Sequence, residues 1–217
     1  MRGFGSGNPN MASGEAVKMR AGRVPEVQLG EQLARVRDRL VGQFDGLEVS
    51  GFRGELTLVC APEQVPDILE FCRDDDELSC ELLSDLSWVH WPSGQREEEA
   101  EETTGWPQYR GEDEPGRIEL DYIVRSLRHN HVFRIRTFLP DSGARIATVS
   151  GIYRSAEIME REAYDMVGVD FEGHPDLRRI MMPDEWEGHP HRKDYPLGGV
   201  EVQYHGATVP PPDQRSY

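Results

Sequence analysis

The sequence predicts a two-layer α+β fold, in which helices cover one face of a small mixed sheet and a long extended carboxyl-terminal arm follows. Apolar residues recur at helical spacing near the start of the chain, which indicates an amphipathic helix. Residues 117–124 and 132–139 alternate apolar and polar side chains, a pattern typical of antiparallel strands with one buried face and one wet face. Residues 169–217 show no regular period. The whole order is helix, strand, helix, strand, loop, two or three strands, helix and arm.

The first elements follow from turn and capping signals. Pro25 is expected to open a helix that stops at Asp45-Gly46. The chain turns around Gly51, and Glu55–Ala61 has the composition of a strand. Pro66 lies in the first turn of a second helix, because proline is tolerated where the backbone N–H has no helical partner. The acidic run 74–76 ends that helix.

The remaining elements of the domain are strands and one helix. A strand is predicted within 78–91, followed by the two alternating strands and a short strand over 145–150. Ser155 is expected to cap a helix that leads into the arm, because its hydroxyl is suited to accept from the first free N–H groups. The predicted division is a tail over 1–24, an α+β domain over 25–168 and an arm over 169–217.

Two segments are expected to lie outside the core. Residues 1–24 are rich in Gly, Ser and Asn and are predicted to be disordered. Residues 92–116 hold eight acidic residues against Arg96 and Arg110, which predicts an exposed acidic loop. A solvated insertion between two strands explains this loop more simply than a dock for a basic partner.

Length and charge restrict the function. A chain of 217 residues suits one domain with tails. The formal net charge of −16 argues against binding to nucleic acid or to an anionic membrane surface. No apolar run approaches the roughly 18 residues of a membrane span, and the amino terminus lacks the apolar region of a secretory signal. These features predict a cytosol-like compartment.

The three cysteines are predicted to be reduced core residues. Cys60, Cys72 and Cys80 are odd in number, fit no C-x-x-C spacing and stand among apolar neighbours. We therefore predict neither a disulfide nor a metal role for them.

Residues 160–197 are the most informative stretch, since charges, aromatics, Gly, Pro and His are mixed there without a period. An aromatic-Glu-Gly-His-Pro phrase occurs at Phe171–Pro175 and again at Trp186–Pro190, which predicts two similar turns. His174, His189 and His191 with nearby carboxylates suggest a metal site, but their loop-like neighbours and the lack of an H-E-x-x-H spacing argue against it.

Other chemistry fits this stretch poorly. The sequence holds no nucleophile motif and no Gly-rich phosphate loop. Glu160 and Glu162 are better explained as ion-paired helix residues beside Arg161 than as an acid–base pair. A charged, Pro-rich and aromatic segment has no ladder for its backbone polar groups, so it gains order by lying along another surface. The stretch is therefore interpreted as a docking arm.

The pattern resembles the signature of the thirty-kilodalton subunit family of respiratory complex I, whose bacterial member is called the C subunit of NADH-quinone oxidoreductase. The residues that carry the resemblance are Glu160, Arg161, Glu162, Asp165, His174, Arg178, Ile180 and Met181, and the likeness continues to Leu197. One departure is Val167, where the family usually has an aromatic residue.

The resemblance implies a structural subunit of the peripheral arm of a proton-translocating NADH:quinone oxidoreductase, which supports electron transfer from NADH to quinone. Its implied partners are the forty-nine-kilodalton-type subunit, called the D subunit in bacteria, and neighbouring peripheral-arm subunits, on the cytoplasmic side of a bacterial membrane. FMN, iron-sulfur clusters, NADH and quinone would belong to the assembled complex. This chain would hold no cofactor and no catalytic residue, which agrees with the lack of a cluster ligand set or dinucleotide fingerprint.

The residues that we predict at the subunit interface share charge or aromatic character within the arm. They are Glu160, Arg161, Glu162, Asp165, Phe171, His174, Arg178, Arg179, Trp186, His189, Arg192, Lys193, Asp194 and Tyr195. For each of them a contact within the chain is an equally open alternative. Two other functions also stay open. One is the equivalent subunit of a membrane-bound hydrogenase or of a dehydrogenase with another electron donor, and the other is a metallohydrolase built on the three histidines.

Overall fold

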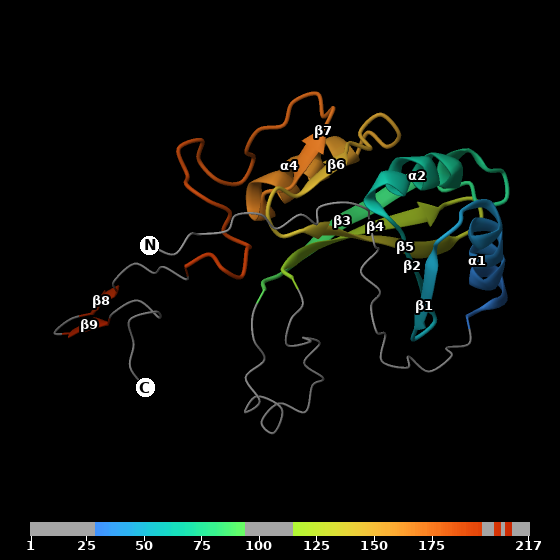
Figure 1. Cartoon of the computed structure of the whole chain (residues 1–217), viewed down its shortest axis with the longest axis horizontal. Helices are drawn as coiled ribbons and strands as arrows, with labels where there is room; N and C mark the ends of the chain where they lie inside the picture. Colours follow the sequence, from blue (N-terminus) through green and yellow to red (C-terminus); the bar gives the residue numbers. More distant parts are fainter. Residues whose placement is uncertain (1–28, 94–114, 197–201, 205–206, 210–217) are drawn as a thin grey trace, which may run out of the picture.

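The computed structural model describes residues 29–93, 115–196, 202–204 and 207–209. The predicted disordered tail and most of the predicted acidic loop lie outside these residues, so both remain predictions. Figure 1 shows the arrangement of the described elements.

The core of the fold is a five-stranded mixed sheet in the order β1-β2-β5-β4-β3. Its strands are β1 (Glu48–Phe52), β2 (Glu55–Val59), β3 (Leu82–Trp91), β4 (Arg117–Ser126) and β5 (His131–Pro140). Only β2 and β5 pair in parallel, while the other neighbours are antiparallel. The predicted strands are confirmed. The sequence does not predict β1, because the turn that ends it lies at Arg53-Gly54, with positive φ at both residues, and not at Gly51.

Three α-helices of the described chain cover one face of this sheet (Figure 1). They are α1 (Glu31–Gln43), α2 (Val65–Asp74, after the 3₁₀ turn η1 at Pro62–Gln64) and α4 (Ala156–Val167). The first two meet through the rings of Phe44 and Phe71, whose centroids lie 5.5 Å apart. Buried residues of all three helices share one hydrophobic cluster with the sheet. The predicted two-layer α+β architecture is confirmed.

Helix α1 departs from the sequence prediction in its start, and helix α4 departs from it only in its cap. Helix α1 begins after Gly30, whose ψ of 151° is extended. Pro25, where the sequence predicts the start, lies outside the described residues. Glycine there favours a boundary because it loses more backbone entropy in a helix than other residues. Ser155 precedes α4 as predicted but makes no capping bond. Its hydroxyl donates instead to the Leu83 carbonyl at 3.1 Å, which ties the helix to β3.

The face of the sheet opposite the helices is charged and packed, and not simply wet. On β4, Ile118, Leu120 and Tyr122 point to the helices and are fully buried, as the alternation predicts. The opposite-facing Asp121 is nevertheless only 9% exposed. Arg136 covers it with two hydrogen bonds of 2.7 Å from Nε and Nη2, because a planar guanidinium matches both oxygens of a carboxylate.

The chain continues beyond the large sheet into a small parallel pair, β6 (Arg145–Ala147) with β7 (Asp170–Glu172). Phe171 of β7 is 1% exposed and belongs to the main hydrophobic cluster. The core therefore extends past residue 168, where the sequence predicts that the arm separates from the domain. Farther on, β8 (Val202–Tyr204) and β9 (Ala207–Val209) form an antiparallel pair.

Two general features complete the fold. Cys60, Cys72 and Cys80 are free and buried, as predicted. In the described part of the chain, no helix has the length and apolar character needed to cross a membrane.

Candidate functional site

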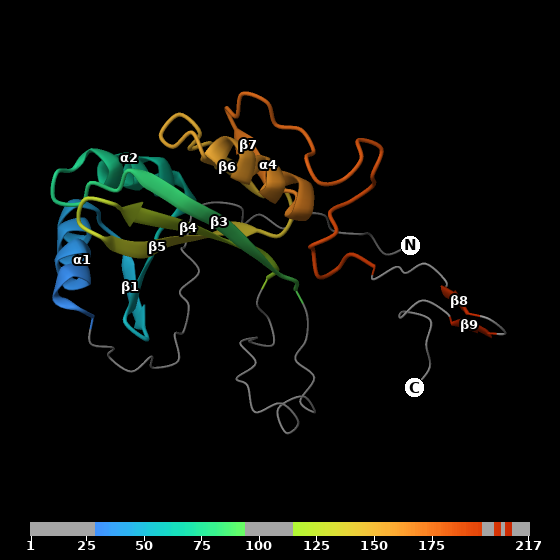
Figure 2. The ribbon, with the colours of Figure 1, turned by 180° about the vertical axis from the view of Figure 1, so that it is seen from behind.

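The candidate site is residues 173–196, here called the carboxyl-terminal segment, together with α4, onto which the segment folds. After Gly168, at φ +81°, the chain leaves α4, passes through β7 and then runs without regular secondary structure. Figures 1 and 2 both place α4 above β3, with the segment looping beyond its end. The surface that orders this part of the predicted arm is thus the chain's own helix.

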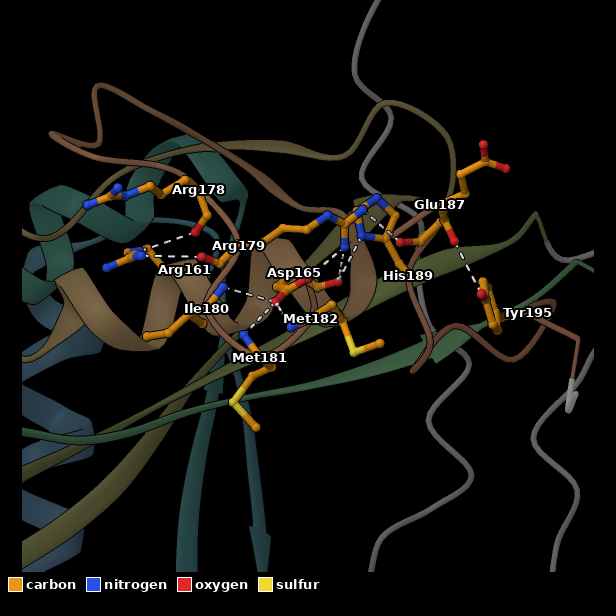
Figure 3. A network of polar contacts seen from close by, with 11 residues as sticks. Arg161, Asp165, Arg178, Arg179, Ile180, Met181, Met182, Glu187, His189 and Tyr195 are labelled. Carbon is orange, nitrogen blue, oxygen red and sulfur yellow. Dashed lines mark hydrogen bonds and ion pairs between the residues drawn. The ribbon is translucent and has the colours of Figure 1, made fainter. Parts of the chain in front are cut away.

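Asp165 on α4 is the main anchor of the segment (Figure 3). Its Oδ2 accepts the backbone N–H groups of Ile180, Met181 and Met182 at 3.0, 2.7 and 2.8 Å. Its Oδ1 accepts Nη1 of Arg179 at 2.6 Å. Burial alone raises the pKa of a carboxyl group, but these four donors outweigh burial and lower the pKa of Asp165. One ionised carboxylate therefore holds a whole turn of the segment.

Arg161 stands one helical turn before Asp165 and binds the same stretch. Its Nε donates to the Arg178 carbonyl at 3.2 Å, and Nη2 donates to the Arg179 carbonyl at 3.3 Å. Residues four apart lie on one face of a helix, so Arg161 and Asp165 both bind the segment from the same face of α4. The predicted pairing of Arg161 with Glu160 and Glu162 is not what the structure shows, because the guanidinium reaches main-chain oxygens instead.

Glu160 points the other way, into the core. Its side chain is fully buried, and it accepts Val149 N–H at 2.7 Å and the Thr148 hydroxyl at 2.5 Å. Burial raises its pKa and outweighs both hydrogen bonds. His174 Nε2 lies 3.9 Å from the same carboxylate. Glu160 therefore joins α4 to the loop after β6 within the domain.

The two Gly-His-Pro turns are similar, as predicted. Gly173 and Gly188 have φ of +84° and +82°. Both following histidines reach α4: His174 Nε2 donates to the Glu157 carbonyl at 2.9 Å, and His189 Nδ1 donates to the Asp165 carbonyl at 3.0 Å. A Cβ on Gly188 would lie 2.7 Å from the Tyr195 ring, so that position requires glycine for close packing. The repeated phrase serves to attach the segment to α4 twice.

A second anchor lies on β3. His90, whose side chain is fully buried, accepts the Lys193 N–H on Nδ1 at 2.8 Å and bonds Asp141 through Nε2 at 2.8 Å. Arg192 bridges Asp141 and Asp194 at 2.5 and 2.9 Å. Since β3 also packs against α4, the two anchors belong to one connected platform. The segment is therefore held at two separate points.

The structure does not gather the three histidines of the metal hypothesis. Within residues 29–93 and 115–196, the one group of three ligand-type side chains close enough to share an ion is His90, Asp141 and Asp194. The guanidinium of Arg192 already lies between its two carboxylates. A cation there would have to displace a matched positive charge.

The predicted interface residues divide into inward and outward groups. Glu160, Asp165 and Phe171 are buried, so for these three the open alternative of a contact within the chain is the one observed. Arg161, Glu162, His174, Arg179, His189, Arg192 and Tyr195 are half-buried, and most of them bind the segment itself. Arg178, Trp186, Lys193 and Asp194 are exposed. The assignment of any of them to an interface stays a prediction.

Sequence reasoning misses three parts of the site. It treats His90 and Asp141 only as parts of a strand and of a turn, because no local signal links them to a segment some fifty to one hundred residues away. It includes Met181 only as part of the motif, yet that side chain is 63% exposed and points away from Asp165 (Figure 3). No local signal identifies it, because its exposure and the backbone contacts to Asp165 arise only in the folded chain.

Comparison with solved structures identifies the class of the fold. The chain superposes on a chain of the membrane-bound sulfane sulfur reductase, an archaeal respiratory membrane complex, with a TM-score of 0.54 and 23% identity over 77% of this chain and 87% of that one. The shared feature is the α+β fold.

Sequence comparison identifies the family. Residues 58–201 match the model of the respiratory-chain NADH dehydrogenase 30 kDa subunit. The C subunit of NADH-quinone oxidoreductase from Acidothermus cellulolyticus is 39% identical over 87% of this chain and 87% of its own length. The C subunits from Nocardia farcinica and Mycolicibacterium smegmatis are 41% and 40% identical over 76% of this chain. The chain spans only 57% and 61% of the length of those two relatives. The chain belongs to the thirty-kilodalton subunit family of respiratory complex I.

Proposed function

We propose that the chain is a non-redox structural subunit of the peripheral arm of a proton-translocating NADH:quinone oxidoreductase, and that its carboxyl-terminal segment docks on the D subunit, the forty-nine-kilodalton type. Family membership supports the assignment to this complex. The particular partner and the docking role are inferred from the geometry of the segment. In this proposal the chain lies on the cytoplasmic side of the membrane and is attached through the complex.

The observation that carries the docking proposal is the combination of rigid anchoring and apolar exposure. Ile180, Met181 and Met182 are fixed through their backbones to Asp165, yet Ile180 and Met181 are 38% and 63% exposed. Trp186 is 40% exposed in the following loop. A folded protein gains nothing by holding apolar side chains rigidly in water, whereas preorganised apolar and aromatic anchors bind a partner at low entropic cost.

The charged residues near these apolar side chains are suited to form the polar rim of the proposed interface. Arg178 and Lys193 are exposed at either end of the segment. Exposed charges around an apolar centre contribute more to orientation and association rate than to affinity. The proposed interface therefore has an apolar centre at Met181 and Trp186 and basic residues at its edge.

The same proposal assigns no cofactor to this chain. The full sequence holds three cysteines, fewer than the four thiolates that an all-cysteine iron-sulfur cluster uses. FMN, the iron-sulfur clusters, NADH and quinone are assigned to the other subunits, and this chain contributes by positioning its neighbours. An absorbance spectrum of the isolated full chain with flavin or cluster bands would contradict this part of the proposal.

The docking role is tested by affinity purification from native membranes. The full-length tagged chain, a Met181→Asp/Trp186→Asp double variant and a Leu127→Asp control are compared by mass spectrometry of the co-purifying subunits. Leu127 is 66% exposed in the turn between β4 and β5, so it controls for a new surface carboxylate elsewhere. We expect the double variant to lose the D subunit, since burying one unpaired carboxylate costs several kcal/mol.

The outcomes are distinct. Retention of the D subunit by the double variant would contradict the docking surface. If the D subunit were also lost from the Leu127→Asp control, the loss would reflect added surface charge in general and not the carboxyl-terminal segment. The identity of the co-purifying subunits also distinguishes complex I from the alternative complex. An NADH-oxidising flavoprotein supports complex I, while a hydrogenase-type or sulfur-reducing partner supports the alternative.

A further inference from the structure

Cys72 and Cys80 lie next to each other in the core, although eight positions separate them in the sequence. Cys72 is in the last turn of α2, and Cys80 lies just before β3. The Cys80 N–H donates to the Cys72 carbonyl at 2.8 Å. Standard bond lengths then keep the two α-carbons within about 7 Å. A disulfide needs roughly 4.4–6.8 Å between α-carbons, so this backbone contact brings the pair close to the required range.

The side chains converge as well. Cys80 raises the pKa of Cys72 and Cys72 lowers the pKa of Cys80, as expected of two neighbouring thiol groups. Both residues are fully buried. The preceding Ser79 has a φ of +42°, a left-handed conformation that a non-glycine residue adopts only where its surroundings impose it. The turn is therefore shaped so as to bring Cys80 back against α2.

A buried histidine completes the cluster. His131 Nε2 lies 3.7 Å from the Cys80 sulfur. The residue is 5% exposed, and its Nδ1 is buried with no hydrogen-bond partner among the described residues. A buried polar atom without a partner costs free energy, and such atoms are rare in folded proteins. The imidazole is thus held next to a thiol in a position that packing alone does not favour.

The two thiols differ in acidity. The neighbouring Cys72 thiol, together with His131, outweighs burial and lowers the pKa of Cys80. Burial raises the pKa of Cys72. A thiolate is the reactive form of cysteine, so Cys80 has the character of a nucleophile and Cys72 that of a second thiol that attacks later.

The cluster lies behind a surface cavity of about 540 Å³. Val36, Leu78, His129 and His131 are among the residues that line it. Two of these also contact the Cys80 sulfur, which lies 3.8 Å from the Leu78 carbonyl and 3.7 Å from His131. The His131 ring stacks on that of His129 at a centroid distance of 6.0 Å. One layer of residues therefore stands between Cys80 and a cavity with room for a molecule as small as a peroxide.

We propose that Cys80 and Cys72 form a reversible dithiol–disulfide site that is oxidised by hydrogen peroxide, with His131 as the proton acceptor. His131 takes the proton of the Cys80 thiol, and the thiolate attacks one peroxide oxygen. The O–O bond breaks, hydroxide leaves and takes the proton back as water, and Cys80 becomes a sulfenic acid. The Cys72 sulfur then attacks the Cys80 sulfur, the S–O bond breaks, and a second water leaves with the Cys72 proton. Two thiols lose two electrons, and one peroxide becomes two waters.

Cys60 is the internal comparison for this site. It is also a buried thiol, 7% exposed. Burial raises its pKa to about 12, and no imidazole nitrogen is in hydrogen-bond contact with it among the described residues. It should therefore be slow to react with peroxide in the folded chain, and a Cys60→Ser variant should leave the site intact.

The test uses the folded full-length chain. The reduced protein is exposed to peroxide, the reaction is stopped with catalase, and the remaining thiols are alkylated in denaturant. Trypsin cleaves after Arg73, so a disulfide between Cys72 and Cys80 appears by mass spectrometry as two linked peptides that a thiol reductant separates. Cys60 shares a tryptic peptide with Cys72, so the same link in Cys60→Ser assigns it to Cys72. A His131→Asn variant, shown to be folded by circular dichroism, should form the link about tenfold more slowly because less Cys80 is ionised.

Three results would overturn the proposal. One is peroxide oxidation of Cys60 without the linked peptides, since that would mean the cluster is inert. Another is an unchanged rate in folded His131→Asn, since that would remove the role of the imidazole. The third is stoichiometric zinc in the purified protein that protects both thiols, since a metal would then occupy the cluster. The proposal involves only the α+β domain and does not depend on docking by the carboxyl-terminal segment.

Discussion

The carboxylate of Asp165 and the guanidinium of Arg179 form an ion pair of 2.6 Å in which the carboxylate is fully buried and the arginine side chain is 14% exposed. The same carboxylate accepts three consecutive backbone N–H groups. A buried charge is stable only where its donors are complete, and here these four donors all come from the segment that the carboxylate holds. The pair therefore couples the folding of the segment to the ionisation of one residue on α4.

Replacing Asp165 with Asn should release the carboxyl-terminal segment. The amide has one accepting oxygen and no charge, so Arg179 and part of the backbone donors are left unpaired, at a cost of about 3 kcal/mol in the free energy of unfolding. Urea unfolding measures this loss, and trypsin should cut faster at Arg178 and Arg179. Asp184→Asn is the control, because Asp184 is exposed on the same segment. Equal resistance of the two variants to trypsin would contradict the role of Asp165 as the anchor of the segment.

Acid should weaken the same anchor. The pKa of Asp165 is lowered in the folded state from its ordinary value of 3.8. Its stabilising contribution is therefore fully present above that value and is lost as the pH falls through the folded pKa. Trypsin is inactive at such pH, so exchange of the Met181 and Met182 amides is the suitable measurement, with pepsin used after quenching. Amide protection that does not change on acidification would count against this linkage.

Glu160 should have the opposite pH dependence. Burial raises its folded pKa above the ordinary value of 4.5, so in that window the folded state binds more protons than the unfolded state. The contribution of Glu160 to stability then decreases as the pH rises from 4.5 through the folded pKa. Glu160→Gln should remove this decrease while losing one hydrogen bond. The free energy of unfolding is measured against pH for the unsubstituted chain and for Glu160→Gln. Parallel pH dependences of the two proteins would refute the prediction.

Gly168→Ala should displace His189 from α4. A Cβ at this position would lie 2.8 Å from the imidazole ring, and the φ of +81° is itself unfavourable for alanine. Gly143→Ala separates the two effects, because Gly143 has φ +67° and nothing within 4 Å of the added carbon. Backbone strain alone costs about 1 kcal/mol. Thermal unfolding should show a larger loss at Gly168 than at Gly143, and equal losses would mean that the imidazole moves aside without cost.

His90 should control the second anchor. Replacing it with Phe preserves a buried ring but removes the acceptor for the Lys193 N–H and the partner of Asp141. We expect a loss of about 2 kcal/mol, since two buried hydrogen bonds disappear. Hydrogen exchange at the Lys193 amide should accelerate, while that of the Met181 amide, held by Asp165, should not. Acceleration at both amides would show that the segment detaches as one unit.

The elements that the sequence predicts correctly are those with local signals. The alternating strands β4 and β5 and helix α2 follow from their apolar period and from Pro66, because these patterns are set by residues a few positions apart. The predicted start of α1 and the predicted turn before β2 are wrong, since a proline or a glycine near a boundary marks it only approximately. The sequence also does not predict the charged opposite face of the sheet, because Arg136 and Asp121 are brought together by strand pairing.

The sequence by itself determined the family, through the order of residues 160–197, and the presence of two similar Gly-His-Pro turns. Only the tertiary structure decided what those residues contact. A run of charges and histidines without a period is equally suited to a metal, a partner or the chain itself, because the distances that distinguish these depend on groups far away in the chain. Here the backbone carbonyls of Glu157 and Asp165 on α4 accept hydrogen bonds from the two histidines. His90 of β3 accepts the backbone N–H of Lys193. The same reason explains why Cys72 and Cys80 lack a recognisable spacing and yet meet in the core.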